Sequence, residues 1–285
     1  MIYGDQKDSD ILQRYCDSLI GAIDAVGAPF EGRSITVIQQ TYLDLIRRIR
    51  CSLIGITVQL RYWPGHGELK IPISLLFRSC VTDILLLLYL KTLEQHTDTF
   101  QNELHLLDKP YVKFVASFIN SGGLGNDEQV IKKQIDNLYT KAAQLLSTTT
   151  PKVSFKNAAT IRDTSDKSLL LLDEARLKGD LSTEAQYHHL ANTADFKHLS
   201  DIFWLFKHFS QHEHYSSFGS HFVHLPQGFE CVQWYKALLC CFETVRIVST
   251  SLEASQELLE DLYINAGPLI ERLKDHQEDL TATSA

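Results

Sequence analysis

The sequence predicts an all-α protein, a single bundle of about eight to ten helices. Only seven prolines and fourteen glycines occur in 285 residues, and leucine is abundant, which favours helices over a turn-rich β fold. Apolar residues also recur every three or four positions through much of the chain, the spacing that gathers them on one face of a helix. A chain of this length can bury a large core, so we expect one domain spanning residues 1–285.

Two amphipathic helices are expected at the start of the chain, over about 8–26 and about 34–61. The first carries one apolar stripe: Ile11, Leu12, Tyr15, Leu19, Ile23 and Val26. The second has the most regular spacing in the chain, with apolar residues that step by three or four: Ile38, Tyr42, Leu45, Ile49, Leu53 and Ile56. Ser34 is a suitable N-cap for this second helix. Its arginines lie largely off the stripe, which is typical of a solvated face rather than of an RNA contact.

The next helix, over about 72–96, is predicted to be the central and most buried one, because residues 81–90 are apolar nearly all round. Arg78 and Asp83 are embedded in it. Their spacing of five residues turns the side chains about 140° apart, so they cannot easily pair with each other. A buried arginine needs an acceptor from elsewhere, and Glu243 on a later helix is a candidate. A structural ion pair and a role in a site both remain open.

The middle of the chain is predicted to continue as helices joined by loops. Residues 97–120 are helical with a break at 108–110, where a proline occurs. Further helices are expected over about 126–146 and 168–178. Between them, residues 147–166 are polar, contain a proline and lack apolar periodicity. We therefore expect a mobile loop or linker there, within the single domain.

The C-terminal part is predicted to hold a helical, histidine-rich stretch and one long helix. The helical run begins near residue 183 and continues through the histidine-rich stretch, 195–228, which a Pro-Gln-Gly sequence closes. The last long helix is expected over about 231–264. A short helix follows the interruption at Pro268, and residues 277–285 are expected to form a flexible tail.

Eight of the twelve histidines lie in or just before the stretch 195–228. Two pairs are spaced so that their rings can meet on one helix face: His208 with His212, and His221 with His224. A helix-bundle metal site could use such pairs, completed by Asp201 or Glu213. The HExxH and ExxH arrangements of known metal sites are absent, however. A divalent metal is therefore an alternative, and no cofactor is favoured.

A second pattern in this stretch combines Tyr215, Ser220 and His224. On a helix, Ser220 and His224 share a face one turn apart. A hydroxyl beside an imidazole can be a structural or ligand-holding pair, or it can be a nucleophile with its general base. A serine nucleophile would also need an oxyanion hole, and no recognisable one occurs. The pair is therefore a candidate site, with the structural or ligand-holding role preferred.

Composition narrows the choice of partners and compartment. The net charge of −8 argues against non-specific DNA binding, which requires a positive surface. The N-terminus is polar and acidic, unlike a signal peptide, and the longest apolar run, 84–90, is too short to span a bilayer. The six cysteines lie mostly in apolar helical patterns, without a CxxC pair. We therefore expect a cytoplasmic protein with reduced thiols and no membrane association.

Two short motifs resemble those of a widespread group of bacterial all-helical domains of unknown function. One is Arg78 with Asp83 in LLFRSCVTDILLLLYL, where the group more usually has Glu slightly closer to the Arg. The other is Tyr215, Ser220 and His224 in YSSFGSHFVHLPQG. The resemblance covers roughly residues 40–260. These domains are similar to the HEPN group, so it implies a HEPN-like bundle.

Many HEPN proteins are metal-independent ribonucleases or components of toxin and antiphage defence systems. The resemblance implies that His224 could act as general acid/base and that Arg78 could hold an RNA phosphate. HEPN ribonucleases carry R-x4–6-H on one helix. The chain has this spacing at Arg61 and His66, but a Pro-Gly pair between them interrupts the helix. The ribonuclease is therefore implied by kinship, and a fold does not fix a function.

Three functions are consistent with the sequence. The first is an interaction or regulatory module of a bacterial defence or stress system, acting with a protein partner or as a homodimer, whose polar pocket contains Arg78, Ser220, His224 and Glu243. The second is a HEPN-like ribonuclease that uses His224 and Arg78 on RNA. The third is a metal-dependent hydrolase with a histidine-rich site. Whether the chain is an enzyme is left open.

Overall fold

A computed structural model describes residues 5–101, 182–199, 201–213 and 227–283, with a few short pieces between 103 and 171. The fold is all-α, as the sequence predicts. Among the described residues the β structure is one antiparallel pair of two-residue strands, β1 (Ser154–Phe155) and β2 (Leu170–Leu171). The remaining described elements are helices.

The chain divides into two compact units, whereas the sequence predicts a single domain. One unit is Met1–Thr92 with Gln186–Ala285, and the other is Leu93–Ala185. The first unit brings together helices from both ends of the chain. The predicted linker, 147–166, falls inside the second unit. Apart from β1 it lies outside the described residues, so its mobility stays a prediction.

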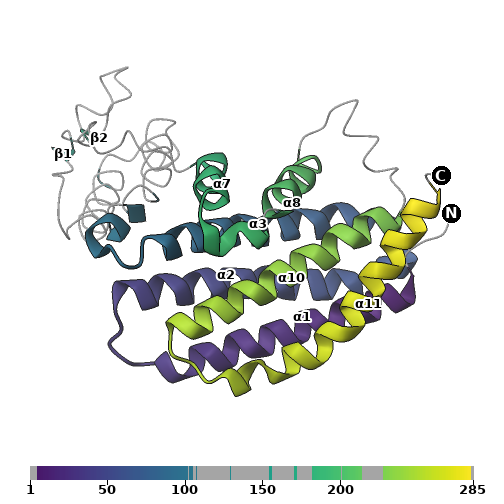
Figure 1. Cartoon of the computed structure of the whole chain (residues 1–285), viewed down its shortest axis with the longest axis horizontal. Helices are drawn as coiled ribbons and strands as arrows, with labels where there is room; N and C mark the ends of the chain where they lie inside the picture. Colours follow the sequence, from purple (N-terminus) through teal and green to yellow (C-terminus); the bar gives the residue numbers. More distant parts are fainter. Residues whose placement is uncertain are drawn as a thin grey trace. The chain divides into compact units, whose positions relative to one another are not determined.

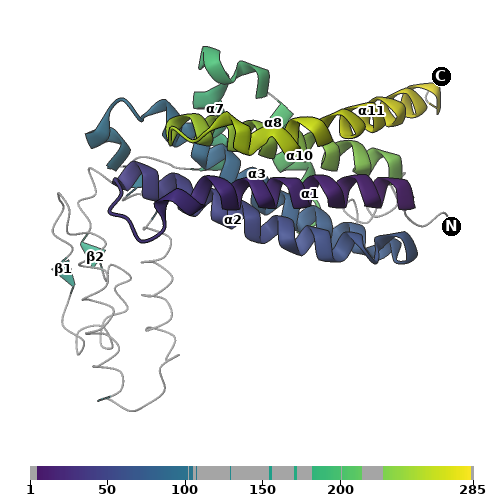
Figure 2. The ribbon, with the colours of Figure 1, turned by 90° about the horizontal axis from the view of Figure 1, so that it is seen from below.

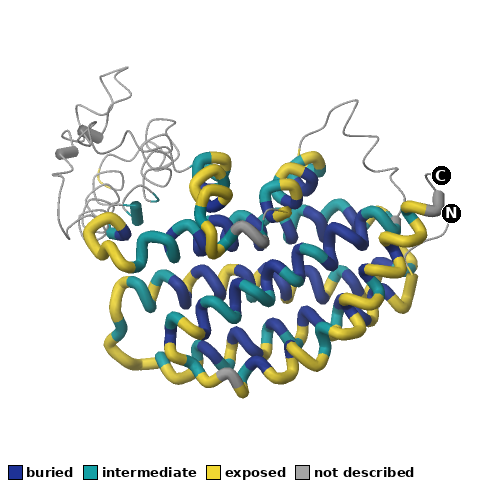
Figure 3. Tube along the Cα trace, viewed as in Figure 1, coloured by how far each residue is buried: buried dark blue, intermediate teal, exposed yellow. Residues whose placement is uncertain are grey.

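Five long helices of the first unit lie side by side (Figures 1 and 2). They are α1 (Gln6–Gly27), α2 (Val37–Leu60), α3 (Lys70–Thr92), α10 (Gln227–Ser251) and α11 (Glu260–Thr283). Helix α1 packs against α2, α10 and α11, and α3 packs against α2 and α10. The outward sides of α1, α2 and α11 are exposed, and the sides that face their neighbours are buried (Figure 3).

Shorter elements complete the described part of this unit. Helix α8 (Asp201–Ser210) packs on α3 and α10, and the 3-10 helix η4 (Ala194–Leu199) connects α8 with α7 (Thr183–Ala191). Four further 3-10 helices lie in the other connections: η1 (Ala28–Phe30), η2 (Trp63–Gly65), η3 (Gly67–Leu69) and η5 (Gln256–Leu259). The helical run predicted to begin near residue 183 is thus divided among α7, η4 and α8.

The starts of α1 and α2 follow from their caps. The Asp5 side chain accepts a hydrogen bond from the backbone N–H of Lys7. At α2, Thr36 and Gln39 form a capping box, in which each side chain accepts from the other residue's backbone N–H. The predicted N-cap, Ser34, lies two residues too early. The capping box prevails because it satisfies the N–H groups of both residues at the helix start.

Helix α10 ends earlier than predicted, so the expected helix over 231–264 is broken. Glu253 has a left-handed backbone with φ 55°, and the N–H of Ala254 bonds to the carbonyl of Ser249 at 2.9 Å. This is the geometry of a helix C-terminus. Glycine is the usual residue at such a position, so its absence here hid the end of the helix from sequence reasoning.

Helix α11, by contrast, passes through the predicted break at Pro268 and reaches Thr283. The predicted flexible tail over 277–285 is therefore wrong as far as residue 283, and the last two residues lie outside the described part. Leu262, Leu269 and Leu273 are buried, so the apolar face continues across the proline. Pro268 itself is exposed. Packing of this face on the neighbouring helices overrides the local preference of proline.

Helix α3 is the most apolar of the five long helices of the first unit. The segment Gly67–Thr92 is long and apolar enough to cross a membrane by length and composition, with a mean hydropathy of 1.9. The apolar run 84–90 is shorter than this segment because Asp83 and Lys91 end the run, whereas the helix continues through both residues. Within the protein, 56% of the apolar window is buried. Core helices of globular proteins meet the same criteria, so length and composition fit both a membrane-spanning helix and a core helix.

Aromatic side chains join α3, α8 and α10 in the core. Phe77 of α3 stacks on Phe209 of α8 with ring centroids 5.8 Å apart, and on Trp234 of α10 at 6.2 Å. Trp63 meets Trp234 edge-on at 5.0 Å. All four rings are fully buried. This aromatic cluster sets the position of α8 against α3 and α10, where the polar groups described next are found.

Candidate functional site

Four of the predicted site residues lie outside the described part of the chain. They are Tyr215, Ser220, His221 and His224. The predicted Ser220–His224 pair, and the predicted approach of His224 to Arg78, therefore stay predictions. The other predicted residues are described, and they fall into separate groups.

Arg78 faces α8 and is partly exposed. Its guanidinium Nη2 lies 2.8 Å from Glu213 Oε2, its Nε donates to Ser210 Oγ at 3.0 Å, and its Cζ lies over the Phe206 ring at 5.5 Å. The predicted partner, Glu243, is wrong. It binds Arg246 one turn along α10, with Nε to Oε2 at 2.9 Å. No local pattern in the sequence indicates that Arg78 meets a residue so far along the chain.

Asp83 belongs to a different contact, between α2 and α3. Its two carboxylate oxygens both accept from Arg48 Nε at 3.1 Å. Burial raises the pKa of Asp83, and Arg48 opposes that rise. The prediction that Arg78 and Asp83 cannot pair with each other is thus confirmed. Asp83 acts as an ion-pair partner on the side of α3 that faces α2, and it does not share a group with Arg78.

The structure brings His208, His212 and Glu230 together in a His–Glu centre. His208 lies in the last turn of α8, His212 follows the helix end, and Glu230 lies in the first turn of α10. His208 Nε2 is 3.3 Å from Glu230 Oε2, and His212 Nε2 is 3.2 Å from Oε1. The side chains are only 1%, 1% and 0% exposed. The predicted meeting of His208 and His212 is confirmed, with ring centroids 5.8 Å apart.

The carboxylate that completes this group is Glu230, and neither predicted carboxylate takes part. Asp201 binds Lys236 at 3.0 Å, and Glu213 binds Arg78. Sequence reasoning missed Glu230, although one signal was present. It lies one turn before Trp234, on a stretch of α10 in which residues 230–235 are all buried. An acidic residue inside such a stretch needs a partner from another element.

Hydrogen bonds hold the Glu230 carboxylate in place. Ser74 Oγ donates to Oε2 at 3.3 Å, and Trp234 Nε1 donates to Ser74 Oγ at 2.9 Å. Burial alone would raise the pKa of Glu230, but His208 and His212 outweigh it and lower the pKa to about 2. The group is therefore an ionised carboxylate at neutral pH. Burial lowers the pKa of nearby Lys70, and Glu230 opposes that effect.

Within the His–Glu centre, His212 Nε2 and Glu230 Oε1 are buried without a well-directed hydrogen bond. His212 Nε2 and Glu230 Oε1 lie 3.2 Å apart, but they are not oriented to bond to each other. Ligands of a tetrahedral zinc ion with bonds of about 2.0–2.1 Å lie about 3.3 Å apart. The ligand atoms of His208, His212 and Glu230 all fall within 4.8 Å of one another. This arrangement can bind a metal ion, or it can share protons between carboxylate and imidazoles.

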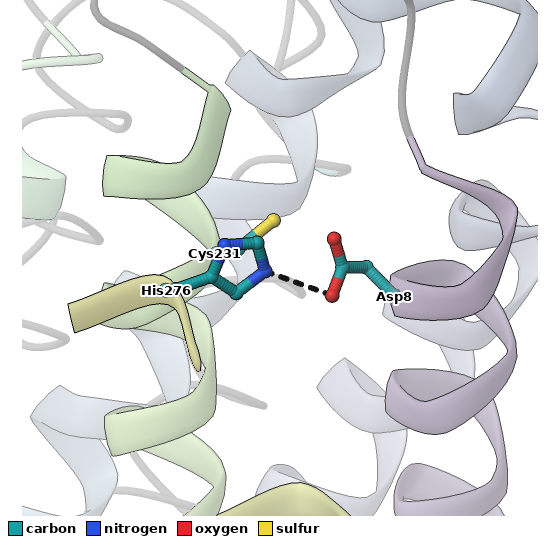
Figure 4. Close-up of side chains that lie close together, drawn as sticks. All are labelled: Asp8, Cys231 and His276. Carbon is teal, nitrogen blue, oxygen red and sulfur yellow. Dashed lines mark hydrogen bonds and ion pairs between the residues drawn. The ribbon is translucent and has the colours of Figure 1, made fainter. Parts of the chain in front are cut away.

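A second buried polar cluster joins α1, α10 and α11. Asp8 Oδ1 lies 2.9 Å from His276 Nε2 and accepts from Tyr235 Oη at 2.7 Å and from Arg272 Nε at 2.7 Å. Burial alone would raise the pKa of Asp8, but His276, Arg272 and Tyr235 together lower it to about 2. Figure 4 shows the Asp8–His276 contact with the Cys231 sulfur beside the ring.

This cluster places a thiol, an imidazole and a carboxylate together, as in some cysteine hydrolases. Burial, however, raises the pKa of the Cys231 thiol well above its usual value, which disfavours the thiolate that would act as nucleophile. Arg272 already balances the charge of Asp8, which disfavours a metal cation there. The cluster is therefore a structural network that holds α1, from the start of the chain, against α10 and α11, from its end.

Gly228 lies close beside this network. A Cβ at position 228 would lie 3.3 Å from Nδ1 of His276, a tight contact that would require the imidazole to shift by a few tenths of an ångström. The glycine therefore leaves room for the imidazole in the position that Asp8 needs.

Comparison with family models, with curated proteins and with solved structures finds no match for this chain.

Proposed function

We propose that this protein is a metal-binding helical regulatory module, in which one divalent ion of the zinc class joins α8 to α10. His208, His212 and Glu230 are the protein ligands. The observation that carries the proposal is the position of the buried Glu230 carboxylate, with one oxygen 3.3 Å from His208 Nε2 and the other 3.2 Å from His212 Nε2.

The ligand set suits such an ion. Imidazole nitrogen and carboxylate oxygen are common ligands of zinc and of neighbouring transition metals. The ionised carboxylate of Glu230 supplies negative charge, and the hydrogen bond from Ser74 orients it as outer partners of metal ligands do. Three protein ligands leave a fourth coordination position, which a water molecule can take.

The ion would have a structural task. Helix α8 has ten residues, too few to be stable alone in water. A metal bridge between its C-terminal end and the first turn of α10 would hold it on α3, next to the Arg78–Glu213 ion pair. The state of α8 would then depend on metal supply, which is the behaviour expected of a regulatory module. A place in a bacterial defence or stress system rests on the sequence resemblance alone.

A structural ion fits the burial better than a hydrolytic one. A metal hydrolase needs a coordination position that substrate can reach, whereas the three ligand side chains are at most 1% exposed. The ribonuclease alternative depends on His224, which lies outside the described residues. RNA cleavage that survives EDTA and is lost in His224→Ala would support that alternative.

The test uses the full chain, purified without chelators. We expect metal analysis to find about one equivalent of zinc or a similar ion. After removal of this metal, Co2+ titration should produce visible absorption bands of a low-symmetry site. His212→Gln should weaken Co2+ binding by about 100-fold or more, since loss of a direct ligand exceeds the loss of its outer partner. Zinc at 100 times its Kd should stabilise the protein by about 2.7 kcal/mol.

His276→Gln is the matched control, because His276 is also a buried imidazole paired with a carboxylate. It should leave the Co2+ affinity unchanged. The proposal fails if the folded wild-type chain retains no metal and gives no Co2+ spectrum. It also fails if His276→Gln lowers the affinity as much as His212→Gln does.

A further inference from the structure

A small apolar cavity, partly open to solvent, lies between α3 and the segment formed by α7, η4 and α8. Its volume is about 130 Å³. Its walls come from all four elements of the first unit that meet there: Leu88 of α3, Leu190 and Ala191 of α7, Phe196 and Leu199 of η4, and Ile202 of α8. Tyr187 is the one lining residue with a polar side-chain atom. The cavity is separate from the His–Glu centre, which involves the other end of α8.

Contacts around the cavity fix its walls without filling it. Tyr187 stacks on Phe203 with ring centroids 4.2 Å apart and planes 9° from parallel, and Lys207 lies 4.9 Å above the Phe203 ring. On the other side, His189 meets Tyr89 edge-on at 5.2 Å, and its Nε2 lies 2.8 Å from Thr92 Oγ1. These contacts attach α7 to both α8 and α3. The space between them therefore cannot close by a small shift of α7 alone.

The size and lining of the cavity select an apolar occupant. Water that enters this space finds almost no polar wall atoms, and an enclosed engineered protein cavity of about 150 Å³ with aliphatic and aromatic walls binds benzene or xenon. The wall atoms that face this space also lack packing contacts. A bound molecule restores those contacts. A charged molecule would lose its hydration without gaining a partner.

We propose that this cavity binds a small uncharged hydrocarbon group about the size of benzene, an aromatic ring or a short alkyl chain. The proposal does not depend on the metal, since none of the cavity residues belongs to the His–Glu centre. Because the group would contact α3, α7, η4 and α8 together, its binding would hold the short helices on the long one.

Benzene is the first probe, with benzoate as its charged counterpart of similar size. Ligand-observed NMR on the full chain should give saturable benzene binding with a Kd of about 1 mM or lower, and no saturable benzoate binding. Leu199→Phe places a larger side chain at the cavity wall and should weaken benzene binding at least about tenfold. Leu190→Ala enlarges the cavity and should shift the preference from benzene to the larger ring system of indole.

Trp204→Ala is the control on α8, because Trp204 is 58% exposed and does not line the cavity. It should leave benzene affinity unchanged. Two variants of opposite effect keep the test informative if one of them fails to fold. The proposal is overturned if wild-type protein does not bind benzene saturably, if benzoate binds equally well, or if the folded wall variants bind benzene as the wild type does.

Discussion

Replacing Asp8 by Asn tests whether a single buried carboxylate holds α1 against α10 and α11. Asp8 is 1% exposed and accepts from Tyr235, Arg272 and His276. An Asn amide keeps one acceptor oxygen but turns an NH2 group toward partners that are themselves donors. It also removes the negative charge that balances Arg272. The substitution is nearly isosteric, so packing changes little and the electrostatic contribution is isolated.

The magnitude follows from the pKa of Asp8. The lowering from 3.8 to about 2 means that the folded state favours the ionised form by about 2 kcal/mol. Removing one member of a buried ion pair typically costs about 3–5 kcal/mol, but Arg272 retains Asp5 as a partner. We therefore expect Asp8→Asn to lower the free energy of unfolding by about 2–4 kcal/mol at pH 7. Because the folded pKa is lowered, this contribution is present above pH 3.8 and is lost as pH falls toward about 2.

Urea unfolding followed by circular dichroism, at pH 7 and at steps down to pH 3, measures both effects. The difference in unfolding free energy between wild type and Asp8→Asn should be largest at pH 7 and should shrink below pH 4. Asp17→Asn, at an exposed position of the same helix, is the control and should change stability by less than about 0.5 kcal/mol. The reasoning is refuted if the two variants are equally stable at pH 7, or if their difference does not depend on pH.

Four further substitutions test separate parts of the structure by the same urea measurement. Glu230→Gln in metal-free protein should lower the free energy of unfolding by about 3 kcal/mol at neutral pH. This loss should diminish as pH falls from 4.5 toward about 2, because folding lowers the pKa of Glu230 over that interval. A stability difference that stays constant across this pH range would contradict the prediction. Phe77→Ala should cost about 3–5 kcal/mol, because its ring packs on Phe209 and Trp234; a loss under about 1 kcal/mol would mean that the site collapses to refill the space. Thr36→Ala removes one half of the capping box and should cost about 1 kcal/mol, whereas Ser34→Ala should be neutral if Thr36 is the true cap.

The regular helices were predictable because their signal is local. In α2 the apolar residues step by three and four, and Tyr42, Ile49 and Ile56 of that stripe are all fully buried. Helical periodicity relates residues within one turn or two, so a single sequence carries it in full. The same local rule predicted that His208 and His212 share a face, and the structure brings their rings together.

Partners across helices were not predictable in this way. Glu213 lies far from Arg78 in the sequence, as Glu230 does from Ser74, and no periodicity relates such pairs. Glu243 was a reasonable partner for Arg78 by charge, but Arg246 one turn away on α10 binds it instead. Which charges meet depends on how the helices dock. That in turn depends on core packing, such as the aromatic contacts of Trp234.

Helix ends were misjudged where packing and local preference disagree. Pro268 suggested an end that the buried Leu269 and Leu273 override. Glu253 adopts a left-handed conformation that is unusual for its residue type, so the real end of α10 had no glycine to mark it. At both positions tertiary packing determines where the helix ends, because the intrinsic conformational preference of a single residue contributes less free energy than the packing.

The first turns of α10 contribute residues to both polar clusters, and the positions of these residues along the helix determine which cluster each one joins. Glu230 and Trp234 lie one turn apart and face α3 and α8, where Ser74 links them. Cys231 and Tyr235, each one residue further on, face α1 and α11. A shift of one residue turns a helix by about 100°, so α10 presents one polar cluster to each side of the core. A change in the register of α10 would disturb both clusters at once.

Both carboxylates that anchor these clusters lie in the first turn of a helix, Asp8 in α1 and Glu230 in α10. The unpaired N–H groups at a helix start carry positive partial charge and favour a negative side chain there. Burial alone would raise the pKa of each carboxyl, so each also requires partners from another helix: α11 for Asp8 and α8 for Glu230. A buried carboxylate raises the free energy of the folded state until the partner helix docks and supplies its donors. We therefore infer that Asp8 and Glu230 each make folding depend on the docking of the partner helix. An exposed pair such as Arg47–Asp44 bears no such cost, and its removal should change stability by less than about 1 kcal/mol.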